Sequence, residues 1–296
     1  MKVLSLFDGI SCGMVALERA GIHVERYVAY EIEENAIKVS RHNYPQIEQK
    51  GDVFKAEYKE GEFDLLIGGS PCTYWSIARC PYLEDKRETK SSGLGWELFM
   101  QYVRALKEAK PKYFLYENNE SMSDAIKEEI TKQLGVQPIM IDSADFSAQI
   151  RKRYYWTNIP VTMDYIKSDL LFKDVEYEHL YKQSSFSKYA ETMRISKDGT
   201  CYSWDTSGKG NYSQQNRARI KECKMNTLPS SGGDKNNIYL GEYQYRRIHP
   251  IEAERLQTLP DNYTDCLSSK IKRIECVGNG WTVDVIVHIF KGLSTN

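Results

Sequence analysis

The stretch KVLSLFDGISCGMVALERA, residues 2–20, decides which fold to expect of this chain. Residues 2–7 are mostly apolar and predict a buried strand, and residues 14–20 predict a helix. The turn between them contains Gly9 and Gly13. A strand, a glycine-rich turn and a helix open a nucleotide-binding βαβ unit. The two glycines do not have the spacing G-x-G-x-x-G, so a tight turn without a ligand is the alternative.

Acidic residues follow the next predicted elements. Residues 27–30 predict a second strand, Glu31 stands at its end, and residues 34–42 predict a helix. An acidic residue at this position, about 20 residues after the glycine turn, typically binds the hydroxyl pair of a ribose. Asp52 lies in a later loop, where it can accept a hydrogen bond from an adenine amine while Val53 and Phe54 pack on the ring. For Asp52, an Asx turn is the alternative.

The run LLIGGSPC, residues 65–72, leads from another strand to a cysteine. Its apolar residues predict a fully buried strand, and Gly-Gly-Ser-Pro ends that strand in a turn. Cys72 is therefore expected just past the carboxyl end of a strand, where open α/β sheets bind ligands. A thiol at such a position can be a nucleophile if its thiolate is favoured. A small buried side chain beside a turn is the other interpretation, and this run alone leaves both open.

Further segments complete an α/β pattern. Residues 113–116 predict a strand, and Glu117 follows it, so another carboxylate stands at a strand end. In QIRKR, residues 149–153, an extended backbone places the guanidinium groups of Arg151 and Arg153 on one face. Such residues at the strand ends of one sheet are what a site in a doubly wound fold requires. The remaining segments predict a strand at 137–141 and helices at 96–109, 123–134, 250–257, 268–276 and 282–290.

Composition excludes several classes of protein. The chain has 296 residues, of which 41% are hydrophobic and 27% charged, enough for one large or two smaller globular domains. No apolar run is long enough to span a bilayer, and no signal-peptide pattern precedes the first strand. Seven cysteines without a C-x-x-C pair disfavour a disulfide framework and a zinc site. We therefore expect a cytoplasmic protein that holds no metal.

The segment from about residue 164 to 245 differs from the rest. Ser, Lys, Asn, Tyr and Gly are frequent in it, and its apolar periodicity is weak. Between residues 181 and 224, nine basic residues stand against four acidic ones, although the formal net charge of the whole chain is −1. Basic residues among Tyr, Asn, Gln and Ser suit contacts to phosphates and base edges. A solvated, irregular insertion is the alternative.

Eight short motifs occur in an order that is typical of one known family. They are FDGISCG, YEI, GDV, GGSPC, ENN, QIRKR, EAERLQ and GNGWTV. In these motifs the chain resembles the cytosine-5 DNA methyltransferases. Its C-terminal part is most similar to the catalytic domains of vertebrate de novo enzymes, whereas its compact size is more typical of bacterial or phage enzymes.

The resemblance implies a fold and a division into domains. The expected fold class is α/β, with a Rossmann-like, doubly wound, mostly parallel sheet of the S-adenosylmethionine-dependent methyltransferase type. The expected catalytic domain consists of residues 1–163 and 246–296, and its C-terminal segment folds back onto it. Residues 164–245 are expected to form a small, irregular, β-rich target-recognition domain.

The resemblance also implies the chemistry of the site. Cys72 matches the nucleophile that adds to C6 of cytosine and so activates C5 toward a methyl group. Glu117 matches the residue that protonates N3, a role that requires a raised pKa. Arg153 matches the arginine that binds O2, and Arg151 is expected near the nucleophile and a phosphate. The target base must leave the duplex to reach such a pocket.

The implied cofactor is S-adenosyl-L-methionine, which becomes S-adenosyl-L-homocysteine, and no metal is implied. The positions that match its binding site are Phe7, Asp8, Gly9, Ile10, Ser11, Gly13, Glu31, Ile32, Asp52, Val53, Ser70, Pro71, Asn279 and Val283. The implied partner is double-stranded DNA, with contacts expected at Ser76, Arg194, Lys209, Arg217, Arg219 and Lys224. We expect a monomer that can share a system with a restriction endonuclease without binding it directly.

Two positions depart from the family pattern. Thr73 stands where the family often has Gln, and Asn119 stands where it has Val, but neither change removes a catalytic group. One alternative is a tRNA cytosine-5 methyltransferase of the same fold, from which the sequence does not separate this chain. A catalytically silent DNA-binding paralogue is disfavoured by the intact cysteine, glutamate and arginine. A nicotinamide-dependent dehydrogenase is disfavoured by the glycine spacing.

Overall fold

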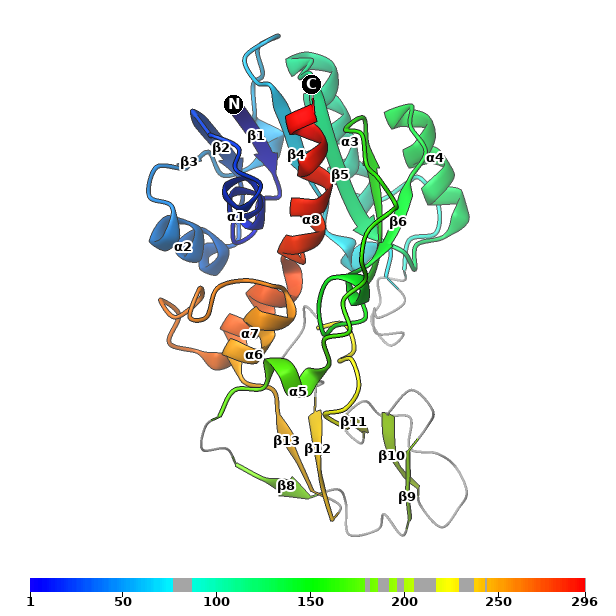
Figure 1. Cartoon of the computed structure of the whole chain (residues 1–296). Helices are drawn as coiled ribbons and strands as arrows, with labels where there is room; N and C mark the ends of the chain where they lie inside the picture. Colours follow the sequence, from blue (N-terminus) through cyan, green and yellow to red (C-terminus); the bar gives the residue numbers. More distant parts are fainter. Residues whose placement is uncertain are drawn as a thin grey trace. The chain divides into compact units, whose positions relative to one another are not determined.

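The computed structural model describes residues 1–76, 87–178, 182–185, 192–195, 200–204, 217–228, 237–242 and 244–295 (Figure 1). The chain forms two compact units. The first consists of Met1–Asp142, Lys152–Tyr165 and Val285–Asn296, and the second of Ser143–Arg151 and Ile166–Asp284. Residues 246–284, which the sequence assigns to the catalytic domain, thus belong to the second compact unit. The functional boundaries at residues 164 and 245 stay a prediction.

A seven-stranded sheet forms the centre of the first unit. Its strands, in spatial order, are β3 (Glu48–Gln49), β2 (Arg26–Tyr30), β1 (Lys2–Leu6), β4 (Leu65–Gly68), β5 (Tyr113–Asn119), β7 (Lys152–Thr157) and β6 (Ile139–Asp142). Strands β1 to β5 are parallel, and β7 runs antiparallel to both β5 and β6. The strand order reverses between β1 and β4, as it does in doubly wound sheets. The expected fold class is therefore confirmed.

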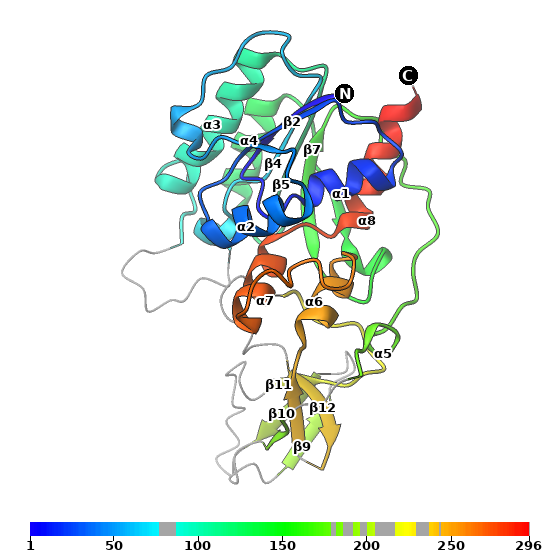
Figure 2. The same cartoon turned by 90° about the vertical axis from the view of Figure 1, so that its left-hand side faces the viewer.

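Helices cover both faces of this sheet (Figure 2). On one side lie α1 (Cys12–Arg19) and α8 (Val283–Phe290), and on the other lie α3 (Leu94–Ala109) and α4 (Asp124–Leu134), while α2 (Glu34–Asn43) follows β2. All five segments were predicted as helices, and their ends differ from the prediction by at most two residues. The α3 side holds an aromatic core of fully buried rings: Trp75, Phe99, Tyr102, Tyr116 and Trp156.

Within its described residues, the second unit combines three helices with a second sheet. The helices are α5 (Phe172–Val175), α6 (Pro250–Leu256) and α7 (Lys270–Asn279). The sheet has the order β8 (Ser184–Ser185), β13 (Gln244–Arg247), β12 (Asn237–Gly241), β11 (Arg217–Arg219), β10 (Thr200–Trp204) and β9 (Thr192–Ile195). Neighbouring strands are antiparallel except β11 and β12. Among the helices of the described residues, none is long and apolar enough to cross a membrane.

Strand β5 is longer than its apolar run predicts. The expected strand ends at Tyr116, but β5 continues through Asn119 because β7 pairs with its polar end. Glu117 lies opposite Tyr155, and Asn119 lies opposite Arg153. Opposed residues of an antiparallel pair share a face, as do residues two apart on one strand. Glu117, Asn119 and Arg153 therefore share one face of the first sheet.

Candidate active site

The glycine turn after β1 has a specific and strained backbone. Phe7, Gly9 and Ser11 have φ angles of 57°, 60° and 61°. Left-handed backbone is ordinary for glycine but costs energy at the two other residues, and such strain is concentrated at functional sites. The structure thus gives this turn a fixed shape, and its binding of a ligand stays a prediction.

The carboxylate of Asp8 holds the turn together. It accepts hydrogen bonds from Ser5 Oγ at 2.6 Å, Ser11 Oγ at 2.5 Å and Tyr27 Oη at 2.7 Å. Burial raises the pKa of Asp8 above its usual value, although the three hydroxyl groups oppose that rise. Asp8 therefore stabilises the conformation of the turn. The motif alone does not indicate this role, because two of the three donors lie outside the turn.

The structure brings the turn and the acid after β2 together. The backbone N–H of Gly9 donates to Glu31 Oε2 at 2.8 Å. Glu31 Oε1 accepts from the N–H groups of Ile32 at 2.8 Å and Glu33 at 2.9 Å. Three backbone donors thus fix a carboxylate at the carboxyl ends of adjacent parallel strands. This is where a doubly wound fold binds a nucleoside, and the ribose role of Glu31 stays a prediction.

The loop after β3 contains the Asx turn that was the alternative for Asp52. Asp52 Oδ1 accepts the N–H of Phe54 at 3.0 Å and caps a short 3₁₀ turn, Val53–Lys55. Val53 is buried, whereas Phe54 is 46% exposed, and Ile32 after β2 is 73% exposed. Two large apolar side chains thus lie open to solvent on the loops that follow adjacent strands. Apolar surface of this kind suits a planar ring, and the adenine role of this loop stays a prediction.

Arg104 of α3 supports the same loop, a contribution that the sequence analysis missed. Its guanidinium donates to Ala56 O at 3.1 Å and Val53 O at 3.0 Å. It also lies over the ring of Tyr58, 5.3 Å from the centroid. Because the partners are 48 and 51 residues away along the chain, no local pattern could have indicated this contact.

The turn that carries Cys72 begins where β4 ends. A Cβ at Gly68 would lie 2.7 Å from Leu6 O and against Tyr102, which explains the glycine there. Cys72–Tyr74 forms a 3₁₀ turn, in which Cys72 O accepts the N–H groups of Trp75 at 3.1 Å and Ser76 at 2.9 Å. The side chain of Cys72 is partly exposed. Cys72 is thus no buried packing residue, and its turn is well braced.

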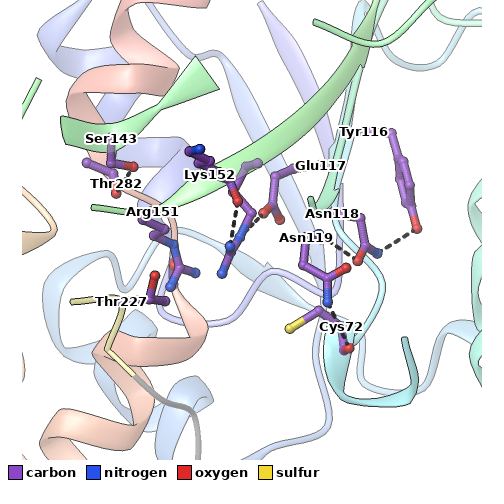
Figure 3. A network of polar contacts seen from close by, with 12 residues as sticks. Cys72, Tyr116, Glu117, Asn118, Asn119, Ser143, Arg151, Lys152, Thr227 and Thr282 are labelled. Atoms are coloured by element: carbon purple, nitrogen blue, oxygen red, sulfur yellow. Dashed lines mark hydrogen bonds and ion pairs between the residues drawn. The ribbon is translucent and has the colours of Figure 1, made fainter. Parts of the chain in front are cut away.

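Strand β5 braces the turn from the side (Figure 3). Asn118 Nδ2 donates to Ser70 O and to Tyr116 Oη, both at 3.1 Å. Ser70 Oγ lies 2.7 Å from Tyr116 Oη, and burial raises the pKa of this phenol above its usual value. Asn119 Nδ2 donates to Cys72 O at 3.3 Å. Ser70, which was predicted at the cofactor site, is buried, and its hydroxyl and carbonyl groups belong to this network.

Glu117 and Arg153 form an ion pair on the shared face of β5 and β7. Arg153 Nε lies 3.0 Å from Glu117 Oε1, and each side chain keeps little more than a tenth of its surface exposed. Arg153 also donates to Lys152 O at 2.7 Å. A carboxyl group and a guanidinium in one shielded place can together bind a polar, planar ring and exchange a proton with it.

The predicted residues of the second unit lie around one turn. Arg151 is buried and donates to Gly280 O at 3.0 Å. Gln257 Nε2 donates to the same oxygen at 3.3 Å, and Gln257 O accepts the N–H of Val283 at 3.0 Å. Asn279 is exposed, whereas Val283 is fully buried. The cofactor roles of Asn279 and Val283 stay predictions.

The residues expected to contact DNA differ in where the structure places them. Lys224 Nζ donates to Ser147 O, Ser168 O and Leu170 O, at 2.9, 3.1 and 3.0 Å. Arg219 is buried and donates to Lys224 O. These contacts give both residues a structural role, and a DNA role for them stays a prediction. Lys209 and the side chains of Arg194 and Arg217 lie outside the described residues.

Within the part of the chain that the structure describes, no group of three or more His, Cys, Asp or Glu side chains could hold a metal ion.

The candidate site consists of two regions in the first unit. One is the Gly9–Glu31 turn with its exposed apolar side chains, and the other is the Cys72 turn with Asn119 and the Glu117–Arg153 pair.

Comparison with protein families gives one match over most of the chain. The family model for "C-5 cytosine-specific DNA methylase" matches residues 1–165 and 151–295. The chain is 27% identical, over an alignment 331 residues long, to type II methyltransferase M.FnuDI of Fusobacterium nucleatum, covering 98% of this chain and 93% of that protein. It is 40% identical over 121 residues to the orphan methyltransferase M.Rho11sI of Bacillus phage rho11s. That match covers 40% of this chain and 23% of the phage protein's length.

Solved structures share the fold over nearly the whole length. The methyltransferase EhMeth of Entamoeba histolytica superimposes with a TM-score of 0.73 at 13% identity, covering 99% of this chain and 97% of that one. The Dnmt2 methyltransferase of S. pombe gives a TM-score of 0.66 at 17% identity, covering 98% and 97%. At these identities the likeness establishes the fold and leaves the substrate open.

Proposed function

This chain belongs to the C-5 cytosine-specific DNA methylase family, and on that premise we propose that it transfers a methyl group to C5 of cytosine in double-stranded DNA. The observation that carries the proposal is the arrangement around β5. A partly exposed cysteine is braced against this strand by Asn119, and the strand also presents Glu117 paired with Arg153. Nucleophile, proton donor and binding group thus come from two strands and one turn of the same sheet.

Each residue has a defined part in the proposed reaction. The thiolate of Cys72 adds to C6 of cytosine, and a proton passes from the carboxyl group of Glu117 to N3. Arg153 binds O2 and fixes the orientation of the ring. After methylation, loss of the C5 proton to a base, return of the N3 proton to Glu117 and elimination of the thiolate restore the aromatic ring and the acid. Arg151 is buried and donates to Gly280 O, so its contact with a phosphate stays a prediction.

The residues of the first turn fit S-adenosyl-L-methionine. The Gly9 N–H and its neighbours fix the carboxylate of Glu31, which would bind the ribose hydroxyl groups. Ile32 and Phe54 offer exposed apolar surface for the adenine ring, on the loops after adjacent strands. This methyl donor has no pyrophosphate, so a turn that departs from G-x-G-x-x-G is appropriate. When bound, the cofactor supplies the methyl group that the activated C5 takes.

Relatives support DNA as the substrate. The full-length alignment with a type II methyltransferase supports a DNA-modifying role in a restriction–modification system, in which an endonuclease acts on the same sequence. The local excess of basic residues between residues 181 and 224 supports a phosphate-binding role for the second unit. The target cytosine would be flipped out of the duplex, at a cost of a few kcal/mol. A monomer in the cytoplasm would suffice for this activity.

A covalent trap tests the proposal. Sequencing of 5-methylcytosine in cells that express the protein gives the recognised sequence. A duplex oligonucleotide with 5-fluorocytosine at that position, incubated with the protein and S-adenosyl-L-methionine, should then form a denaturation-resistant adduct at Cys72, because fluorine blocks the final loss from C5. Methylation and trapping on tRNA transcripts instead of DNA would overturn the DNA substrate. Absence of an adduct on either nucleic acid would overturn the whole mechanism.

A further inference from the structure

Asn119 is an unusual residue for the inside of a sheet. Its side chain is 3% exposed, and its Oδ1 is buried without a hydrogen-bond partner. Its Nδ2 donates to Cys72 O at 3.3 Å, across 47 residues of chain (Figure 3). A buried acceptor without a partner is costly, so stability alone does not favour an amide here. Local rules are most often broken in this way at functional sites.

The contact of Asn119 completes a pair of anchors around the nucleophile. Asn118, on the opposite face of β5, donates to Ser70 O, and Asn119 donates to Cys72 O. The backbone N–H of Asn119 also donates to Asn118 Oδ1 at 2.8 Å, which links the backbone of Asn119 to the side chain of Asn118. Residues on both sides of Pro71 are therefore tied to the same strand. This fixes the Cys72 turn from two directions.

The contact between Asn119 and Cys72 affects the reaction because Asn119 shares a face of the sheet with Glu117 and Arg153. Asn119 lies two residues from Glu117 on β5 and opposite Arg153 on β7. One amide thus connects the residue that carries the thiol with the face that carries the acid and the guanidinium. A displacement of about 1 Å between reacting groups can slow a reaction roughly a hundredfold, so such a connection affects rate.

We propose that Asn119 is a positioning residue that holds Cys72 in register with Glu117 and Arg153. The proposal rests on the function proposed above for this site. The amide acts through the backbone of Cys72 and is not itself a reacting group. Its orphan Oδ1 is the structural cost of placing a donor at this point.

Two substitutions separate positioning from simple support of the fold. Asn119→Val removes the donor and the orphan acceptor, and Asn119→Asp keeps the shape but replaces the donor with an acceptor that faces Cys72 O. We expect either variant to form the 5-fluorocytosine adduct and to methylate DNA about tenfold more slowly, with KM for DNA and for S-adenosyl-L-methionine within about twofold of wild type. The melting temperature of Asn119→Val should be equal or higher, because a costly buried acceptor is gone.

Asn158 provides a matched control at the other end of β5. It accepts from the N–H of Phe114 and donates to Lys112 O, both at 2.9 Å. Asn158→Val should lower the melting temperature and leave the adduct rate per folded molecule unchanged. An adduct at the wild-type rate in both Asn119 variants would overturn the inference alone. A lower melting temperature in Asn119→Val with a wild-type adduct rate would also overturn the inference alone. Absence of an adduct with the wild-type protein would overturn the proposed function as well.

Discussion

Arg153 Nε lies 3.0 Å from Glu117 Oε1, and the two residues come from antiparallel strands that meet at the polar end of β5. The pair is largely shielded from water. In such a place a charge-assisted hydrogen bond is stronger than on a surface. The guanidinium therefore limits the positions that the carboxyl group can take toward a bound ring.

Glu117→Gln should reduce methyl transfer strongly without preventing DNA binding. The amide keeps the size of the side chain and a hydrogen-bond acceptor, but it cannot pass a proton to a ring nitrogen. Positioned proton transfer contributes about 10²- to 10⁴-fold to rate, so kcat should fall by a factor in that range. Transfer of radiolabelled methyl groups and a DNA gel-shift assay measure the two quantities. A kcat within threefold of wild type would contradict the proton-donor role.

Cys72→Ala should abolish methyl transfer while cofactor affinity remains. The side chain of Cys72 is partly exposed, and its backbone carbonyl rather than its sulfur makes the described contacts of the turn. Removal of the sulfur should therefore leave the fold intact. Calorimetric titration with S-adenosyl-L-homocysteine checks cofactor binding, and the methyl-transfer assay checks catalysis. Residual transfer at a tenth of the wild-type rate or more would assign the nucleophile to another residue.

The sequence predicts the parts of the site that are encoded locally. The strand, turn and helix at residues 2–20 were visible from apolar runs and glycines, and the meeting of Gly9 with Glu31 follows from parallel strand ends. The extent of β5 was not visible, because polar residues belong to it only through pairing with β7. The Asn119–Cys72 contact depends on that pairing in turn. It appeared in the sequence only as a departure from a family pattern.

Charge patterns were less informative than apolar ones. Nine basic residues between 181 and 224 indicated a phosphate-binding surface, yet Arg219 and Lys224 donate to backbone carbonyls inside the second unit. A long basic side chain can satisfy buried carbonyl groups as well as bind an anion, and composition does not separate the two. The hydrogen bonds in the structure show which carbonyl groups Arg219 and Lys224 reach.

Removal of one residue of the buried ion pair in the second unit should lower the stability of the protein severely. Arg246 and Glu252 are both fully buried, with Nη2 and Oε1 2.7 Å apart, and Glu176 lies 2.9 Å from the same nitrogen. Glu252→Ala leaves a buried guanidinium short of a counter-ion, so the unfolding free energy should fall by about 3–5 kcal/mol. The double variant Arg246→Met with Glu252→Met should lose much less. Urea unfolding followed by circular dichroism checks both, and a loss in the double variant as large as in the single one would contradict this explanation.

Glu48 of β3 should make a small, acid-sensitive contribution to stability. Hydrogen bonds from Arg26, and then from Lys50, lower the pKa of Glu48 from 4.5 to about 2. A carboxyl group whose pKa is depressed on folding stabilises the protein above its unfolded value, and that contribution is lost as the pH falls from 4.5 through 2. Glu48→Gln should therefore cost less than about 1 kcal/mol at pH 7, since the pair is partly exposed and screened, and only a small fraction of that at pH 2. Urea unfolding at several pH values measures the difference.

Glu31→Ala should weaken cofactor binding far more than DNA binding. The carboxylate is oriented by the N–H groups of Gly9, Ile32 and Glu33, so its position does not depend on the ligand. A hydrogen bond from a neutral group to a charged one contributes about 1.5–3 kcal/mol, which corresponds to a rise in Kd of at least about tenfold for S-adenosyl-L-homocysteine. Glu33→Ala is the matched control, because Glu33 accepts the N–H of Ala36 at the start of α2 and should affect stability by about 1 kcal/mol instead. Equal calorimetric affinities for wild type and Glu31→Ala would remove the ribose role, and a loss of affinity in Glu33→Ala as large as in Glu31→Ala would place the effect in the helix rather than in the carboxylate.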